Sequence, residues 1–151
     1  MRRYLLFLFL TLSLTPAGAQ PKYEVRAAWV TAVYGLDWPQ TKATTPAGIR
    51  RQQEELIEIL DKLKAANFNT VLFQTRTRGD VLYKSSIEPY NSILTGKVDG
   101  DPGYDPLAFA VRECHKRGME CHAWMVALPL GNKKHVAKTG KKNTLKKKKK
   151  K

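Results

Sequence analysis

The chain contains few cysteines, and their spacing argues against both a disulfide scaffold and a metal site. Cys114 and Cys121 are the two cysteines among its 151 residues. Two cysteines do not make the framework of a disulfide-rich domain, and free cysteine is usually buried, so we expect two buried thiols; a single bridge is the alternative. Each cysteine is followed by a histidine, but this spacing matches none of the usual zinc motifs, so we expect no metal.

Motifs that bind nucleotides or mark a nucleophilic serine are also absent. No GxGxxG, and no GxxxxGK followed by Ser or Thr, comes after a predicted strand, and there is no GxSxG. The sequence therefore offers no evidence for a nucleotide-binding domain or an α/β-hydrolase, and we expect no cofactor.

Acidic residues are missing from residues 132–151, where eleven lysines account for most of the formal charge of +14. The remaining residues carry 16 basic and 13 acidic side chains, so we expect no nucleic-acid partner for the domain itself. The lysine-rich tail is predicted to be disordered, or to come from a truncation or frameshift. The alternative is a tether to an anionic surface, which salt would release.

The N-terminus has the organisation of a secretory signal peptide. Arginines precede an apolar run at residues 5–14, and small residues follow at 17–19. The run is too short to span a bilayer. We therefore expect residues 1–19 to be removed, leaving a domain at residues 20–131 that is secreted or periplasmic, in the cell envelope, without a transmembrane segment.

The domain begins with a strand, a helix and a second strand. The valine-rich residues 24–33 predict a buried strand, and residues 69–75 predict another. Between them, Thr45 is a suitable N-cap for a helix that starts at Pro46 and carries an apolar stripe. We expect this helix to end at Asn67 in a left-handed conformation.

A second helix and a third strand continue the pattern. Asp105 is the expected N-cap, Pro106 the first helical residue and Gly118 the stop signal, after which residues 119–128 predict a strand. The order βαβαβ, without any other internal repeat, predicts an α/β fold with parallel strands and right-handed crossovers.

The two long connections that follow strands are residues 34–45 and 76–104. Such connections build the active face of α/β folds, so we expect them to line one rim of the sheet. They hold carboxylates and arginines that can hydrogen-bond hydroxyls, and aromatic rings that can stack on sugars. With two side chains of the third strand, the candidates are Asp37, Trp38, Arg76, Arg78, Asp80, Tyr83, Ser85, Ser86, Glu88, Tyr90, His122 and Trp124.

Structural roles are the alternative for several aromatic and charged side chains. We expect Trp29 and Phe73 to be core residues, as large aromatics inside strands usually are. Arg76 and Asp80 can equally pair with each other to hold the long loop. His122 can equally be an interior histidine with its hydrogen bonds satisfied.

Catalytic residues cannot be assigned from the sequence. A glycosidase needs two carboxyl groups about 5–10 Å apart across the scissile bond. Asp37, Asp80 and Glu88 are the candidates, although Glu88 precedes a proline and can belong only to a turn. The catalytic pair therefore stays unknown.

Several longer stretches carry a resemblance to a known family. In order, they read EVRAAWV, LDWP, FNTVLFQTRTRGDVLYKSSIEP and GYDPLAFAVRECHKRGMECHAWM. Their order and spacing resemble the start of the glycosyl-hydrolase-10-like family of bacterial secreted proteins, over about residues 24–131. The resemblance implies a TIM-type (β/α) barrel that hydrolyses O-glycosidic bonds of a bacterial glycan, with peptidoglycan-derived strands among the implied substrates.

The resemblance also implies which side chains contact the substrate. Its Asp-Trp, Gln-x-Arg-x-x-Gly-Asp and His-Ala-Trp motifs fall, in that order, on Asp37 and Trp38; on Gln74, Arg76, Gly79 and Asp80; and on His122 to Trp124. Beside them, Arg78, Tyr83 and Glu88 complete the predicted substrate-binding set.

Two departures and the length limit what the resemblance implies. Thr77 stands where many members have proline, and Met125-Val126-Ala127 stands where many have Phe-Asn-Pro, so we expect an asparagine contact to be missing. A complete barrel of eight strands takes about 250 residues, whereas three strands are predicted here. We therefore expect an incomplete TIM-type barrel of about three βα units that lacks the catalytic carboxylates.

The sequence thus predicts the N-terminal fragment of a secreted glycoside hydrolase, inactive as this chain. Two alternatives stay open. One is a non-catalytic carbohydrate-binding module, and the other is a secreted module tethered to an anionic surface by its polylysine tail. A glycan is the expected ligand both of the glycoside hydrolase fragment and of the carbohydrate-binding module.

Overall fold

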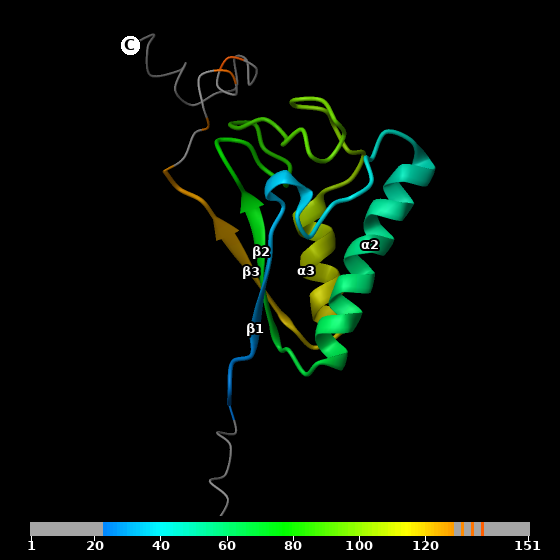
Figure 1. Cartoon of the computed structure of the whole chain (residues 1–151), viewed down its shortest axis with the longest axis vertical. Coiled ribbons are helices and arrows are strands. Elements are labelled where there is room, and N and C mark those ends of the chain that lie inside the picture. The colour runs from blue at the N-terminus through cyan, green and yellow to red at the C-terminus, as the bar shows by residue number, and fades with distance from the viewer. Residues whose placement is uncertain (1–22, 129–130, 132–133, 135–136, 138–151) are drawn as a thin grey trace, which may run out of the picture.

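The structure is a computed structural model that describes residues 23–128, 131, 134 and 137 (Figure 1). The expected signal peptide and nearly all of the lysine-rich tail lie outside the described residues. The elements are β1 (Ala27–Val30), the short 3-10 helix η1 (Val33–Gly35), α2 (Pro46–Ala65), β2 (Thr70–Arg76), α3 (Pro106–Lys116) and β3 (Glu120–Met125). The predicted α/β order is confirmed, and it is the order of a TIM-type β/α arrangement.

The sheet has β2 at its centre, with β1 and β3 parallel to it on either side. The register places Trp29 beside Leu72 and Leu72 beside His122. The outer strands are shorter than the predicted ranges of 24–33 and 119–128, because regular pairing stops where the flanking residues turn into loops. The predicted parallel pairing is confirmed.

Local signals place both helices as predicted. The Thr45 hydroxyl accepts a hydrogen bond from the Gly48 amide (3.0 Å) at the start of α2, and the Asp105 carboxylate accepts one from the Ala108 amide (3.0 Å) at the start of α3. After α2, Asn67 has a φ of 62° and so takes the predicted left-handed conformation. Neither helix has the length and apolarity needed to cross a bilayer, judged over the described residues.

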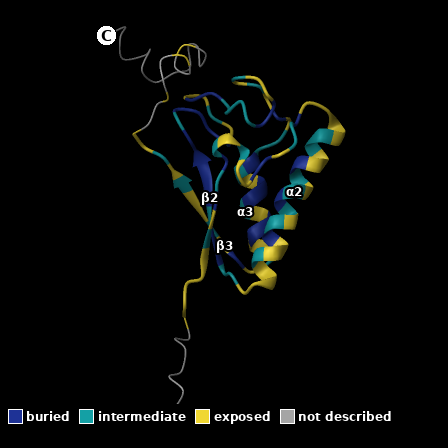
Figure 2. Ribbon diagram, viewed as in Figure 1, coloured by how far each residue is buried: buried dark blue, intermediate teal, exposed yellow. Residues whose placement is uncertain are grey.

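Both helices lie on the same side of the sheet (Figure 1). Buried residues lie between these helices and β2 and continue into the loops at one end of the sheet (Figure 2). Phe73 of β2 is 1% exposed, which confirms its predicted place in the core. Cys114 is buried and Cys121 half-buried, both as free thiols. Hydrogen bonding with Cys121 and burial raise the pKa of the Cys114 thiol.

The prediction that Trp29 is a core residue is wrong. Its side chain is 59% exposed, and Ala27 of the same strand is exposed as well. The ring lies edge-on to Trp124 of β3, with 4.6 Å between the ring centroids. Trp29 belongs to the sheet face opposite the helices, and among the described residues no second layer covers that face.

Candidate functional site

The segments that follow the three strands lie together at one end of the sheet, because the strands are parallel (Figure 1). We call this end the rim; it consists of residues 31–45, 77–104 and 126–128. The long middle segment is folded onto the domain, since Leu82 and Leu94 are fully buried. The rim is therefore a packed part of the structure that can hold side chains in fixed positions.

Gln74, near the end of β2, organises the segment that follows β1. Its side-chain oxygen accepts hydrogen bonds from the Thr31 hydroxyl (2.8 Å) and from the amides of Ala32 (2.8 Å) and Val33 (3.0 Å). The Asp37 carboxylate accepts another from the Thr31 amide (2.8 Å). Both predicted site residues thus fix the backbone that enters the rim from β1.

Arg76 forms a buried ion pair with Glu88. Two hydrogen bonds of 2.7 Å join the guanidinium to the carboxylate, and both side chains are about one-tenth exposed. The guanidinium also donates to the carbonyls of Val126 and Ala127, after β3. These bonds to Glu88 raise the pKa of Arg76. The pair therefore joins the segments that follow β2 and β3.

Asp80, the alternative partner for Arg76, hydrogen-bonds with other groups. The Asp80 carboxylate accepts hydrogen bonds from the Thr77 hydroxyl, the Arg78 amide (3.2 Å) and the side-chain amide of Asn91 (3.0 Å). Gly79, with a φ of 78°, supplies the turn that brings these donors around the carboxylate. The alternative that Arg76 pairs directly with Asp80 is therefore wrong, because Glu88 reaches the guanidinium from farther along the same segment.

Trp38 is a core residue of the rim. Its side chain is fully buried, packs on Phe73 with 5.6 Å between ring centroids, and donates a hydrogen bond to the Gln52 carbonyl (2.8 Å). A ring in this position presents no face to a ligand. The Asp37-Trp38 pair thus places an exposed carboxylate beside a side chain that anchors the segment.

A cavity of about 330 Å³ opens among the rim segments. Arg78 and Asp80 contribute to its wall, and so do three side chains that the sequence did not single out: Tyr34, Lys42 and Asn91. The Lys42 ammonium donates a hydrogen bond to the Ile93 carbonyl (2.7 Å), and burial lowers its pKa. The cavity therefore has a polar wall with donors, a carboxylate and one aromatic ring.

A second cavity, of about 520 Å³, lies beside the rim segment 77–104. Ser85 and Tyr90, both rim candidates, contribute to its wall. Burial, followed by the charges of neighbouring aspartates, raises the pKa of Tyr90. Tyr83 is half-buried, and its interaction with Arg76 contributes to the raised pKa of that guanidinium.

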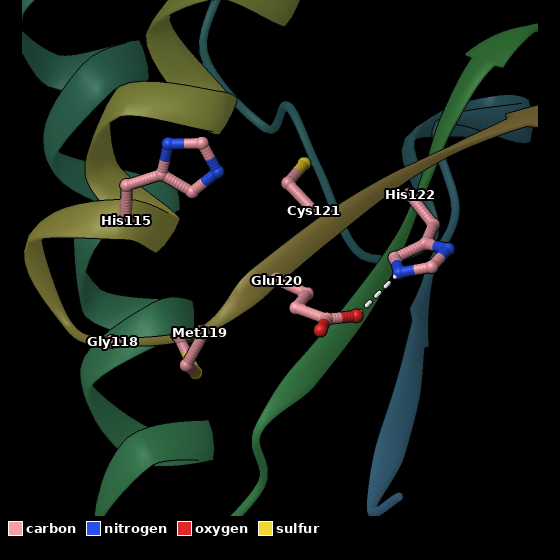
Figure 3. Close-up of a pocket in the computed structure, with 6 residues that line it drawn as sticks. All are labelled: His115, Gly118, Met119, Glu120, Cys121 and His122. Carbon is pink, nitrogen blue, oxygen red and sulfur yellow. Dashed lines mark hydrogen bonds and ion pairs between the residues drawn. The ribbon is translucent and has the colours of Figure 1, made fainter.

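His122 lies away from the rim. It sits near the start of β3 and pairs with Glu120 at 2.7 Å, with more than half of its side chain exposed (Figure 3). Both line a shallow cavity of about 440 Å³, to which α3 contributes His115. The alternative of an interior histidine is wrong, because the face that carries His122 is uncovered. No three His, Cys, Asp or Glu side chains within the described residues are placed to bind a metal.

The structure thus brings some of the predicted residues together and separates others. Arg78 and Asp80 share the rim cavity, whereas Arg76 and Glu88 pair with each other outside its lining and His122 lies elsewhere. Substrate contact stays a prediction for these five residues. Tyr34 could not be found from the sequence, because it belongs to none of the motifs and its backbone conformation is visible only in the structure.

Comparisons with known proteins identify relatives of the chain by sequence. A family model described as glycosyl hydrolase-like 10 matches residues 24–150. Glycosyl hydrolase YngK of Bacillus subtilis strain 168 is 41% identical over 108 residues, covering 72% of this chain and 21% of that relative. Glycosyl hydrolase DigH of Escherichia coli strain K12 is 39% identical over 120 residues, covering 72% and 27%, and DigH of Shigella flexneri gives the same values. The chain spans about a quarter of the length of these relatives.

Proposed function

Because the chain belongs to the glycosyl hydrolase-like 10 family, we propose that its rim binds a bacterial glycan as part of a glycoside hydrolase acting on O-glycosidic bonds. Membership of this family supports a glycosidase-like function. The glycan itself, including peptidoglycan-derived strands, is our proposal. So is export to the cell envelope through residues 1–19, which lie outside the described residues.

The rim cavity is the observation that carries this proposal. It lies where the parallel strands end, which is where TIM-type enzymes bind their substrates. Its wall combines the hydrogen-bonding groups of Arg78, Asp80 and Asn91 with the ring of Tyr34. Sugars present both hydroxyl groups and a flat apolar face of C–H bonds, so such a wall matches them well.

Cleavage makes a further demand on the carboxyl groups. A glycosidase needs one carboxyl group as an acid and another as a base or nucleophile. The three rim carboxylates in question all accept hydrogen bonds already: Asp37 from a backbone amide, Asp80 from three donors and Glu88 from Arg76. We therefore propose that this chain contributes binding, and that the catalytic pair is not among these three residues.

Glycan binding by the purified chain is the test. The probes are amidase-treated peptidoglycan glycan strands and β-1,4-linked N-acetylglucosamine tetramers, with affinity measured by titration calorimetry and cleavage by an assay for new reducing ends. Arg78→Ala should weaken binding by about 10- to 100-fold, since hydrogen bonds to charged groups are worth about 1.5–3 kcal/mol.

A second arginine provides a matched control for Arg78→Ala. Arg112 on α3 also stacks over an aromatic ring, that of Phe109 at 5.1 Å, but it lies on a helix outside the rim. Arg112→Ala should leave the affinity unchanged. Equal losses in the two variants would mean that the rim assignment is wrong, and absence of binding to both probes would refute the proposed function.

A further inference from the structure

Tyr34 is an exposed aromatic residue held in an unfavourable backbone conformation at the rim. Its side chain is 76% exposed, and its φ of 55° lies in the left-handed region, which is costly for a residue other than glycine. Such conformations persist where the surrounding structure imposes them, and they are concentrated at functional sites. The conformation therefore calls for an explanation beyond packing, because a ring this exposed packs against little.

The backbone on both sides of Tyr34 is fixed by the rest of the rim. On its N-terminal side, the amides of Ala32 and Val33 donate to the buried side chain of Gln74. On its C-terminal side, Gly35 has a φ of 68° and lies against Ile93, since a Cβ atom added there would be 3.3 Å from the Ile93 side chain. These contacts set the direction in which the Tyr34 ring projects.

Arg78 fixes the ring itself. Its guanidinium carbon lies 4.8 Å from the centre of the Tyr34 ring, and the guanidinium donates a hydrogen bond to the Tyr34 hydroxyl (3.1 Å). The two residues come from the segments that follow β1 and β2, and both line the 330 Å³ cavity with Asp80 and Asn91. A flat ring with much of its surface in solvent is thus held at the edge of a polar cavity.

We propose that Tyr34 is the residue on which a pyranose ring stacks when a glycan occupies the rim cavity. The apolar C–H face of the sugar would cover the exposed part of the Tyr34 ring, while its hydroxyl groups reach the polar cavity wall formed by Arg78 and Asn91. Arg78 has a second role, because it holds the ring in place. This proposal rests on the proposed function and names a contact that the sequence motifs do not include.

Two substitutions at Tyr34 separate stacking from hydrogen bonding. Tyr34→Ala removes the ring, whereas Tyr34→Phe keeps the ring and removes only the hydroxyl. With the N-acetylglucosamine tetramer as probe, Tyr34→Ala should weaken binding about tenfold, and Tyr34→Phe should remain within about threefold of the unsubstituted chain. Because the side chain is exposed, neither change should shift the thermal unfolding midpoint, which circular dichroism can verify.

Tyr23 supplies the matched control. It is also exposed, at 85%, but it precedes β1 and so lies at the opposite end of that strand from the rim. Tyr23→Ala should leave the affinity unchanged. Selective labelling of tyrosine rings adds a direct measurement, since the NMR signals of Tyr34 should shift on titration with the tetramer and those of Tyr23 should not.

The outcomes distinguish this proposal from the proposed function. If Tyr34→Ala binds as tightly as the unsubstituted chain while Arg78→Ala binds more weakly, the rim binds glycan and the stacking role is refuted. If Tyr34→Phe loses as much affinity as Tyr34→Ala, the hydroxyl and not the ring is responsible, which also refutes stacking. If the unsubstituted chain binds no glycan probe, the proposed function fails and this inference fails with it.

Discussion

The buried ion pair between Arg76 and Glu88 gives the sharpest test of how the rim is held together. Two 2.7 Å hydrogen bonds join the side chains, which are 10% and 11% exposed. Glu88→Gln preserves the volume of the side chain but removes its negative charge. The buried Arg76 guanidinium then has one good hydrogen-bond acceptor fewer. Removing one partner of a buried ion pair lowers the free energy of unfolding by about 3–5 kcal/mol. The amide oxygen of the glutamine can still accept one hydrogen bond, so we expect a smaller loss of about 2–4 kcal/mol.

Urea unfolding followed by tryptophan fluorescence measures this loss. The exposed pair of Arg26 and Glu24, at 3.1 Å and with both side chains more than 40% exposed, is the control. Glu24→Gln should change the free energy of unfolding by less than about 1 kcal/mol, as is usual for surface pairs. The comparison isolates burial, because the same chemical change is made in both places.

A double-mutant cycle completes the experiment. Arg76→Met combined with Glu88→Leu removes both charges, and the double variant should be more stable than the sum of the two single losses predicts, by about 1–3 kcal/mol. If the single losses simply add, or if Glu88→Gln costs no more than Glu24→Gln, the two charges are not coupled. The account of Glu88 as the residue that holds Arg76 would then be wrong.

Three further changes test other contacts. Gln74→Leu leaves the buried Ala32 amide without its acceptor and should lower the free energy of unfolding by about 1–3 kcal/mol; an unchanged free energy of unfolding would contradict this. Trp38→Phe removes the indole hydrogen bond to Gln52 and should cost about 1–2 kcal/mol in the same urea assay, whereas an unchanged midpoint would mean that the indole is not held there. The pKa of Glu113 is lowered from its ordinary value of 4.5, chiefly by its hydrogen bond with Lys116. The ionised carboxylate therefore stabilises the fold at pH values above that ordinary pKa, and this stabilisation is lost as the pH falls through the lowered pKa. Glu113→Gln should therefore make the thermal unfolding midpoint less sensitive to pH between about pH 5 and pH 3, and an equally steep fall in the variant would refute this.

The elements could be predicted from the sequence because their signals are local. Thr45 and Asp105 each precede a proline and cap the helix that follows, and Asn67 takes the left-handed conformation that ends the first one. Hydrogen bonds across two or three residues decide these features. A sequence pattern over the same few residues is therefore sufficient to find them.

Partners across long segments could not be predicted in this way. Arg76 is four residues from Asp80 and twelve from Glu88, and nothing in that spacing shows which carboxylate reaches the guanidinium. The exposure of Trp29 was missed for a related reason. A strand pattern indicates that a ring belongs to the sheet, but not which face the helices cover.

The same contacts decide how binding and cleavage can be separated experimentally. The segments that follow β1 and β2 are held by Gln74 and by the buried pair of Arg76 and Glu88, and the cavity wall lies between those segments. All these contacts are made among the described residues 31–127. A chain with this rim should therefore bind sugar while releasing no reducing ends. If reducing ends do appear and Asp80→Asn abolishes them without loss of affinity, then a carboxylate that we assign to binding takes part in the chemistry.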